Sequence, residues 1–338
     1  MENILLIKLK CMGDVVFTIP AVHLLRANFP KARITYLTSQ ENRAIVEQFD
    51  GVDEVWSIDR AVFKRGDLKC ALSSMLNLLG RLRRAKFSLV IDLQSYGETA
   101  LLTRLTGANE RWAWVLGDRF RRHAYTKVIP RQDHRHPVDV NLDLLTQFGL
   151  KTAPVCNKLS VVGEGQDAAY QFFARNQLDP LKPTVVIQAF TSAAHKNWPL
   201  EHYLAVAKHW RNQGVQIIFS GGMKEKHLFG AVEAEGFPVC IGESFRTLSW
   251  IIKLSKLVIG GDTGLLHLAL SIGTQVVVLM VPSGTGSPIP YSHPECVVKP
   301  TVGDDLKTIT IQIVNDSIGR VLLCRELSAN LPNQPRVW

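Results

Sequence analysis

The sequence lacks the short motifs that mark several common enzyme classes. The pattern G-x-x-x-x-G-K-[ST] does not occur, which argues against a P-loop NTPase. Neither H-E-x-x-H nor G-x-S-x-G occurs, which argues against a zinc protease and an α/β-hydrolase nucleophile. Gly284-Thr285-Gly286 is followed by no third glycine, so it is a weak signal for a dinucleotide site.

Paired cysteines and long apolar runs are also missing. The six cysteines are scattered without a C-x-x-C pair, which argues against a zinc site or a disulfide framework and favours the reducing cytoplasm. No uninterrupted apolar run has transmembrane length, and no basic leader precedes the strand-like residues 4–7, so we expect neither a membrane span nor a signal peptide. We expect Cys11 to be a buried, unreactive thiol.

Basic residues outnumber acidic ones, 39 to 30, giving a formal net charge of +9. This excess favours an acidic partner, which leaves nucleic acid, anionic lipid and a phosphorylated substrate open. Aromatic residues do not alternate with the basic clusters as they would in a stacking platform for bases, so the sequence argues against nucleic acid.

The 338 residues are enough for two domains, and strand-like and helix-like segments alternate along both halves. We predict an α/β fold with two doubly wound, Rossmann-like domains, residues 1–160 and 161–338, facing across a cleft. The expected strands are 4–10, 33–38, 54–58, 88–93, 184–190, 215–220, 238–241, 256–259 and 275–281. The expected helices are 15–28, 42–48, 68–84, 98–105, 140–148, 200–212, 224–235, 247–254, 265–271 and 306–325. The last of these could pack on either domain.

The most informative stretch follows the expected strand 256–259. Asp262, Thr263, Gly264, Leu265 and His267 form a polar turn that leads into an apolar helix, and the free N–H groups at such a helix start favour anions. The turn therefore suggests a phosphate-bearing ligand at the carboxyl end of a parallel strand. The structural alternative is that Asp262 and Thr263 only cap the helix and that His267 is a core residue.

Two further strand ends in the second half carry polar residues. Thr191 and Ser192 supply hydroxyls, and Lys196 supplies a compact positive charge suited to a diphosphate. Glu225 follows two glycines and could hydrogen-bond ribose hydroxyls. The alternatives are a solvated surface lysine and a favourable charge in a first helical turn.

At the first strand end, Gly13 allows a close backbone approach and Asp14 stands at the start of the next helix. Asp14 is either a helix cap or a general base that takes a proton from an attacking hydroxyl. Basic residues in loops are candidates for binding an anionic acceptor: Arg60, Lys64, Arg65, Arg119 and Arg122. The basic residues among positions 81–86 stand at the end of an expected helix, where they complement the helix dipole.

These motifs together resemble glycosyltransferase family 9, the ADP-heptose:lipopolysaccharide heptosyltransferases. The resemblance rests on K-x-K-x-x-G-D-V-x-x-x-x-P-A near the N-terminus, K-N-W-P at 196–199, G-G-x-x-E at 221–225 and G-D-T-G-x-x-H at 261–267. Two departures stand out. Gly261 replaces a residue that is often not glycine, and residues 281–288 only loosely resemble the family's last donor loop.

The resemblance implies a GT-B fold and a metal-independent transfer of heptose from ADP-heptose to the inner core of lipopolysaccharide, with inversion at the anomeric centre. By residue match, Asp14 is the catalytic base and Lys196 is the catalytic cation at the diphosphate. Gly13, Thr191, Ser192, Glu225, Asp262, Thr263, Gly264, Leu265 and His267 complete the donor site. His136 also matches a recurring family position and joins the acceptor candidates.

The acceptor would be membrane-embedded, so the resemblance implies an enzyme at the cytoplasmic face of the inner membrane. Two alternatives remain open. One is an inverting transferase that uses a different nucleotide sugar, and the other is a nucleotide-sugar binding module without transfer activity.

Overall fold

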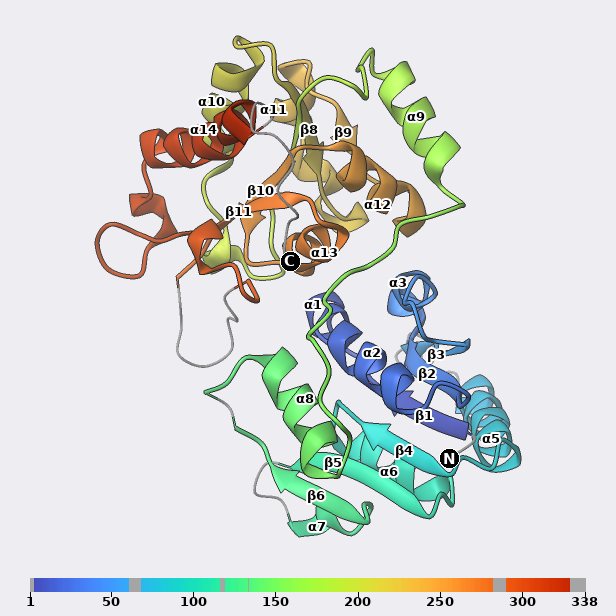
Figure 1. Ribbon diagram of the computed structural model, residues 1–338. Helices are drawn as coiled ribbons and strands as arrows, with labels where there is room; N and C mark the ends of the chain where they lie inside the picture. Colours follow the sequence, from blue (N-terminus) through green and yellow to red (C-terminus); the bar gives the residue numbers. More distant parts are fainter. Residues whose placement is uncertain (1–2, 61–67, 116–118, 133, 282–289, 329–338) are drawn as a thin grey trace. The chain divides into compact units, whose positions relative to one another are not determined.

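The computed structural model describes residues 3–60, 68–115, 119–132, 134–281 and 290–328. The chain divides into two compact units, Met1–Ser160 (unit 1) and Val161–Trp338 (unit 2), each built on its own parallel sheet (Figure 1). No helix within these described residues is both long and apolar enough to cross a membrane.

Unit 1 alternates strands and helices. Its strands are β1 (Asn3–Ile7), β2 (Arg33–Ser39), β3 (Glu54–Ile58), β4 (Leu89–Asp92), β5 (Glu110–Val115) and β6 (Lys127–Pro130). Its helices are α1 (Met12–Val16), α2 (Ile19–Asn28), α3 (Arg43–Val46), α5 (Leu68–Arg84), α6 (Gly97–Leu105), α7 (Arg119–Arg122) and α8 (Pro137–Gln147), with a 3-10 turn at Gln40–Asn42. The strands lie in the order β3-β2-β1-β4-β5-β6.

The strand order of unit 1 reverses between β1 and β4. β1 is buried on both sides, as expected for a central parallel strand covered by helices on both faces. The chain builds outward to β3, returns through α5 to β4, and continues to β6. Right-handed crossovers that run in opposite directions along a sheet place their helices on opposite faces. α2 and α8 pack against each other, and so do α5 and α6.

Unit 2 repeats this organisation. Its strands are β7 (Thr184–Gln188), β8 (Gln216–Ser220), β9 (Val239–Cys240), β10 (Leu257–Gly261), β11 (Gln275–Leu279) and β12 (Val297–Val298). Its helices are α9 (Gln166–Arg175), α10 (Leu200–Arg211), α11 (Gly230–Ala234), α12 (Phe245–Leu254), α13 (Gly264–Ile272) and α14 (Ile311–Ser328), with 3-10 turns at Ala194–Lys196, Met223–Leu228, Pro294–Cys296 and Leu306–Thr308. The strands lie in the order β12-β11-β10-β7-β8-β9, which reverses between β7 and β10.

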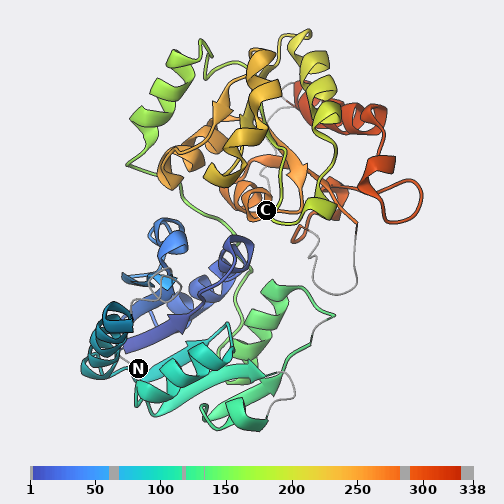
Figure 2. The same ribbon diagram turned by 180° about the vertical axis from the view of Figure 1, so that it is seen from behind.

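The final helix packs within unit 2. The residues expected as one helix begin with the 3-10 turn Leu306–Thr308, and α14 then packs against α10 and the neighbouring strands (Figure 2). The indole Nε1 of buried Trp198 donates to the carbonyl of Ile309 at 3.0 Å. This bond ties the segment after β7 to the start of α14.

Candidate active site

Asp14 lies just beyond the carboxyl end of β1, in the first turn of α1. The residue at the cap position of α1 is Cys11, whose side chain makes no cap hydrogen bond, and Asp14 lies inside the first turn, so Asp14 is not the N-cap residue. The Asp14 side chain is 39% exposed, which leaves it accessible from solvent. Cys11 has a φ of 53° and is exposed, so the expectation of a buried thiol is also wrong.

A buried lysine holds the carboxylate of Asp14. Lys8 Nζ lies 3.4 Å from Asp14 Oδ2 and donates to the carbonyl of Leu93 at 3.1 Å. Burial lowers the pKa of Lys8, and the charge and hydrogen bond of Asp14 act in the opposite direction. The pair fixes one carboxylate oxygen at the point of unit 1 where the strand order reverses.

The pocket that contains Asp14 is lined by three basic side chains, one of which, that of Arg135, also forms an ion pair with Asp143. Besides Lys8, it is lined by Arg131 and Arg135, which follow β6, and by Gln94 and Tyr96, which follow β4. The Arg131 guanidinium lies 4.4 Å from the centre of the Trp114 ring, which gives it a cation–π support. A sugar bearing carboxylate or phosphate groups would find both attraction and a carboxylate base here.

In unit 2, the loop after β7 is organised by Asn197. The Asn197 Oδ1 accepts hydrogen bonds from the backbone N and the hydroxyl of Thr191, each at 2.8 Å. The hydroxyl of Thr191 also lies 2.8 Å from the carbonyl of Ala193, so its polar contacts are within its own loop. Ser192 is exposed.

Asp262, directly after β10, contacts the side chains of Lys196 and His267. Lys196 Nζ lies 3.2 Å from Asp262 Oδ2, and Nε2 of buried His267 lies 3.4 Å from Oδ1. Burial raises the pKa of Asp262, but the hydrogen bonds and charges of His267 and Lys196 outweigh it and hold the pKa below its ordinary value. Asp262 is therefore an ionised anchor that holds Lys196 in place.

The start of α13 has unsatisfied donors. Thr263 is its N-cap residue, yet its side chain makes no cap hydrogen bond, and its buried Oγ1 has no partner among the described residues. The first amide groups of a helix, here those of Gly264 and Leu265, have no partner within the helix, whereas the amide of Leu266 donates to the carbonyl of Thr263 at 3.2 Å. Free N–H groups at a helix start can hold an anion, and the capping interpretation leaves the Thr263 hydroxyl without a partner among the described residues.

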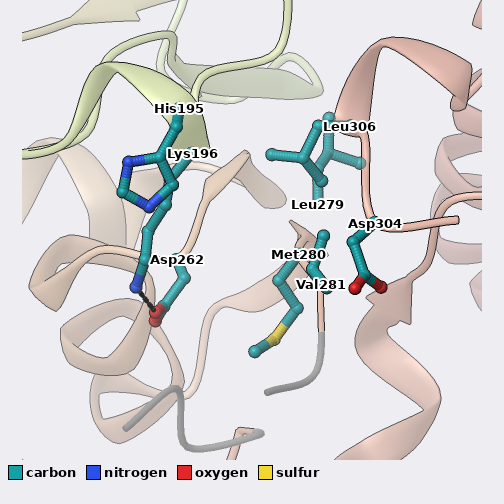
Figure 3. Close-up of a pocket in the computed structure, with 8 residues that line it drawn as sticks. All are labelled: His195, Lys196, Asp262, Leu279, Met280, Val281, Asp304 and Leu306. Atoms are coloured by element: carbon teal, nitrogen blue, oxygen red, sulfur yellow. Dashed lines mark hydrogen bonds and ion pairs between the residues drawn. The ribbon is translucent and has the colours of Figure 1, made fainter.

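A cavity of about 230 Å³ adjoins this site. Figure 3 shows Lys196, His195 and Asp262 on one side of it, and Met280, Val281 and Asp304 on the other. Leu279 and Leu306 complete its apolar wall. A cavity with apolar side chains on one side, together with Asp304, and the Lys196–Asp262 pair on the other suits a ligand with a flat ring and polar groups.

Glycine is required at position 261 by close packing. A Cβ there would lie 2.6 Å from Thr191 Cγ2 and 2.9 Å from the carbonyl oxygen of Lys196. The unusual residue in this motif thus lets β10 lie directly against the loop that carries the site lysine.

Glu225 lies after β8, within the 3-10 turn Met223–Leu228, and is half-buried. Its Oε2 is 2.6 Å from the place where a Cβ on Gly222 would be, so the carboxylate folds back over the glycine backbone. Glu225 is not one of the residues that line the cavity beside Lys196.

The acceptor candidates are spread over unit 1. Arg60 forms an ion pair with Glu98 at 3.6 Å, and Arg122 is exposed on α7. Lys64, Arg65 and the side chain of Arg119 lie outside the described residues. His136 caps α8: its Nδ1 accepts from the backbone N of Val138 at 3.1 Å, and its ring packs edge-on against Phe17.

Sequence reasoning assigned no role to Lys8, Asn197, Arg131 or Arg135. Lys8 and Asn197 were part of recognised motifs, and a buried lysine directly before a candidate base was an available signal. The two arginines follow β6, a strand that the sequence analysis did not predict, so nothing placed them near Asp14.

A family described as glycosyltransferase family 9 (heptosyltransferase) matches residues 75–304, well over half of the chain. This chain belongs to glycosyltransferase family 9. The family membership that the sequence motifs predicted is thereby confirmed, and the protein is a glycosyltransferase. The matched residues include the donor-side motifs of unit 2, whereas Gly13 and Asp14 lie before them.

Individual relatives agree with the family. Lipopolysaccharide heptosyltransferase 3 of Escherichia coli is 25% identical over 280 residues, covering 79% of this chain and 80% of the relative. A glycosyl transferase family 9 structure from Veillonella parvula has a TM-score of 0.84 at 21% identity and covers 95% of this chain and 97% of that one.

The E. coli heptosyltransferase WaaC, solved with ADP, has a TM-score of 0.75 at 20% identity and covers 94% of this chain and 99% of that one. At these identities the structures establish the fold. The predicted α/β class with two doubly wound sheets in a GT-B architecture is confirmed.

Proposed function

We propose that this family 9 enzyme is an inverting heptosyltransferase that moves heptose from ADP-heptose to the inner core of lipopolysaccharide without a metal ion. The observation that carries the proposal is the anion site of unit 2, where the Thr263 hydroxyl and the start of α13 lie beside the Lys196–Asp262 pair. WaaC, of the same fold, was solved with ADP, which supports an adenine nucleotide as the donor's leaving group.

In the proposed reaction, the acceptor hydroxyl gives its proton to the Asp14 carboxylate. Its oxygen forms a bond to the anomeric carbon on the face opposite the nucleotide, and the bond to the diphosphate oxygen breaks, so the configuration inverts. Lys196, the Thr263 hydroxyl and the amides of α13 stabilise the negative charge that grows on the departing ADP. Lys8 fixes the carboxylate, and Glu225 binds the ribose of the donor.

The cationic pocket around Asp14 supports an acidic acceptor. Lys8, Arg131 and Arg135 line it together with Asp14, and phosphates or acidic sugars of the lipopolysaccharide core would bind to these cations. The earlier candidates Arg60, Arg119, Arg122 and His136 remain proposed acceptor contacts, and so do Lys64 and Arg65. Because the acceptor is anchored in lipid, we propose that the enzyme works at the cytoplasmic face of the inner membrane.

The test is the thermal stabilisation of the full-length protein by ADP, UDP, GDP, CDP and NAD at matched concentrations. A ligand that binds only the folded state raises the unfolding midpoint with the logarithm of its saturation. We expect ADP to stabilise selectively. Preference for another nucleoside diphosphate would discard the heptose donor, and preference for NAD would overturn the proposed donor site.

Lys196→Ala should weaken ADP binding by about tenfold or more, since a charge-assisted hydrogen bond contributes about 1.5–3 kcal/mol. Lys182→Ala is the matched control, because this exposed lysine precedes the opposite end of the same strand, β7. Equal ADP affinity in both variants would show that Lys196 does not contact the diphosphate.

A further inference from the structure

Helix α5 carries leucines that are exposed among the residues the structure describes. Leu72 and Leu76 are 61% and 59% exposed. They are four residues apart, so they lie one above the other on one side of the helix. The contacts of α5 with the core of unit 1 come from other residues: Met75, Leu78, Leu79 and Leu82. The two exposed leucines are therefore not needed to hold α5 on its sheet.

The neighbouring helix adds a third leucine. α5 packs beside α6 (Figures 1 and 2). Arg83 Nε donates to the carbonyl of Leu105, the last residue of α6, at 3.3 Å. On α6, Leu101 is 58% exposed. We refer to Leu72, Leu76 and Leu101 as the leucine face.

Positive charge accompanies the leucine face. α5 contains no acidic residue and ends in three arginines. The exposed basic residues of this region are Arg81, which pairs with Glu54 at 3.9 Å, and Arg83, Arg84, Lys86 and Arg104. On α6, Glu98 already pairs with Lys10 at 3.5 Å and with Arg60 at 3.6 Å. The arginines at the end of α5 also complement its dipole, but this does not account for the exposed leucines.

This combination selects one kind of partner. Exposed apolar side chains beside cations that have no acidic partner among the described residues match the boundary between acyl chains and anionic headgroups. A second copy of the same face would bring like charges together, which disfavours self-association there.

We propose that the leucine face and its basic neighbours dock this protein on an anionic lipid bilayer, with α5 lying in the plane of the interface. The leucines enter the headgroup–acyl boundary, and the arginines pair with lipid phosphates. The inference rests on the proposed function, because a lipid-anchored acceptor requires an enzyme that works at a bilayer. It adds the surface that makes the contact.

The test is co-sedimentation of the full-length protein with phosphatidylcholine vesicles, with and without phosphatidylglycerol. We expect binding only when phosphatidylglycerol is present, and less binding as salt is raised, since screening weakens charge attraction. The double variant Leu72→Ser/Leu76→Ser should bind at least about tenfold more weakly, because two partly inserted side chains lose their apolar burial.

The matched control is Leu181→Ser, which removes a 91% exposed leucine beside Lys182 in unit 2. It should bind vesicles like the parent protein. Leu101→Ser provides a second variant on the other helix, should the double variant fail to fold. Arg104→Gln should reduce binding to phosphatidylglycerol vesicles and flatten the salt dependence.

Absence of vesicle binding by the parent protein would overturn the proposal. So would equal losses in the α5 variant and in Leu181→Ser, or a dimer of the parent protein that dissociates in the α5 variant. The binding assay needs no sugar transfer, and ADP stabilisation is measured on every variant. Failure of membrane docking is thus distinguishable from failure of the proposed donor or reaction.

Discussion

Replacing Gly261 by alanine is expected to weaken ADP binding although no atom of Gly261 need touch the nucleotide. The new Cβ would lie 2.6 Å from Thr191 Cγ2 and 2.9 Å from the carbonyl oxygen of Lys196. The methyl group of Thr191 cannot simply rotate away, because its hydroxyl is bound to Asn197 and Ala193. The backbone oxygen has no rotamer to change, so β10 and the lysine loop must separate.

Two separate losses follow from this separation. Forcing an extra methyl into a packed site costs about 1–3 kcal/mol of stability, which lowers the unfolding midpoint of a unit of this size by roughly 2–4 °C per kcal/mol. Displacing Lys196 from Asp262 also moves its ammonium group away from the diphosphate. The contact between Lys196 and the diphosphate is charge-assisted and contributes about 1.5–3 kcal/mol, so the ADP dissociation constant should rise by about tenfold.

Calorimetric titration with ADP and thermal unfolding measure the two losses independently. Gly230→Ala is the control, because that glycine starts α11 and a Cβ on it meets no atom within 4 Å. If Gly261→Ala kept both the ADP affinity and the midpoint of the parent protein, the close packing of strand and loop would not position Lys196.

Two further substitutions test the base and the anchor. Asp14→Asn should lower turnover by about 10²–10⁴-fold while leaving ADP affinity unchanged, and near-normal turnover in a transfer assay would remove Asp14 as the base. Asp262 has a pKa below its ordinary value, so its ionised form stabilises the fold above about pH 4, and this contribution is lost as the pH falls through the folded-state pKa. The stability difference between the parent protein and Asp262→Asn, measured by urea unfolding, should therefore be largest at neutral pH and shrink in acid. A difference that did not change with pH would contradict the ion-pair role.

Hydrophobic patterning alone located most of the fold. The limits of β3 and α5 were predicted to the residue: Asp53 and Asp59 flank β3, and α5 follows Asp67 and ends in two arginines. The expected helix 15–28 divides into α1 and α2, since Pro20 in the first turn of α2 has no N–H to continue a helix through it. β10 extends through Gly260 and Gly261, which resemble turn residues but lie in the strand because a neighbouring backbone approaches them closely.

The missed elements had ambiguous local signals. β5 contains charged residues beside its tryptophans, and β6 has only four residues. α9 begins shortly after the expected domain limit at residues 160 and 161 and was not predicted, although Ala169, Phe172 and Phe173 follow helical spacing and are buried.

The candidate site was predictable where a strand leads directly into a polar turn. Asp14, Lys196 and Asp262 all follow a strand that flanks a reversal of strand order, and parallel sheets gather ligands there. Pairings across the sheet were not predictable, because the contact of Asp262 with Lys196 spans 66 positions in the sequence. His136 was recognised only by resemblance, and its capping bond to Val138 depends on where α8 begins.

The signs of the charges determine how Asp262 can act on the donor. A diphosphate is anionic, and the pKa of Asp262 lies below its ordinary value, so this carboxylate is ionised at neutral pH and would repel a phosphate in direct contact. Lysine carries three N–H donors, so Lys196 can hold Asp262 and a phosphate oxygen at once. We infer that Asp262 acts through Lys196, while neutral donors at Thr263 and the start of α13 face the diphosphate. Removal of Lys196 then removes the attraction itself, whereas Asp262→Asn leaves the cation present but poorly held.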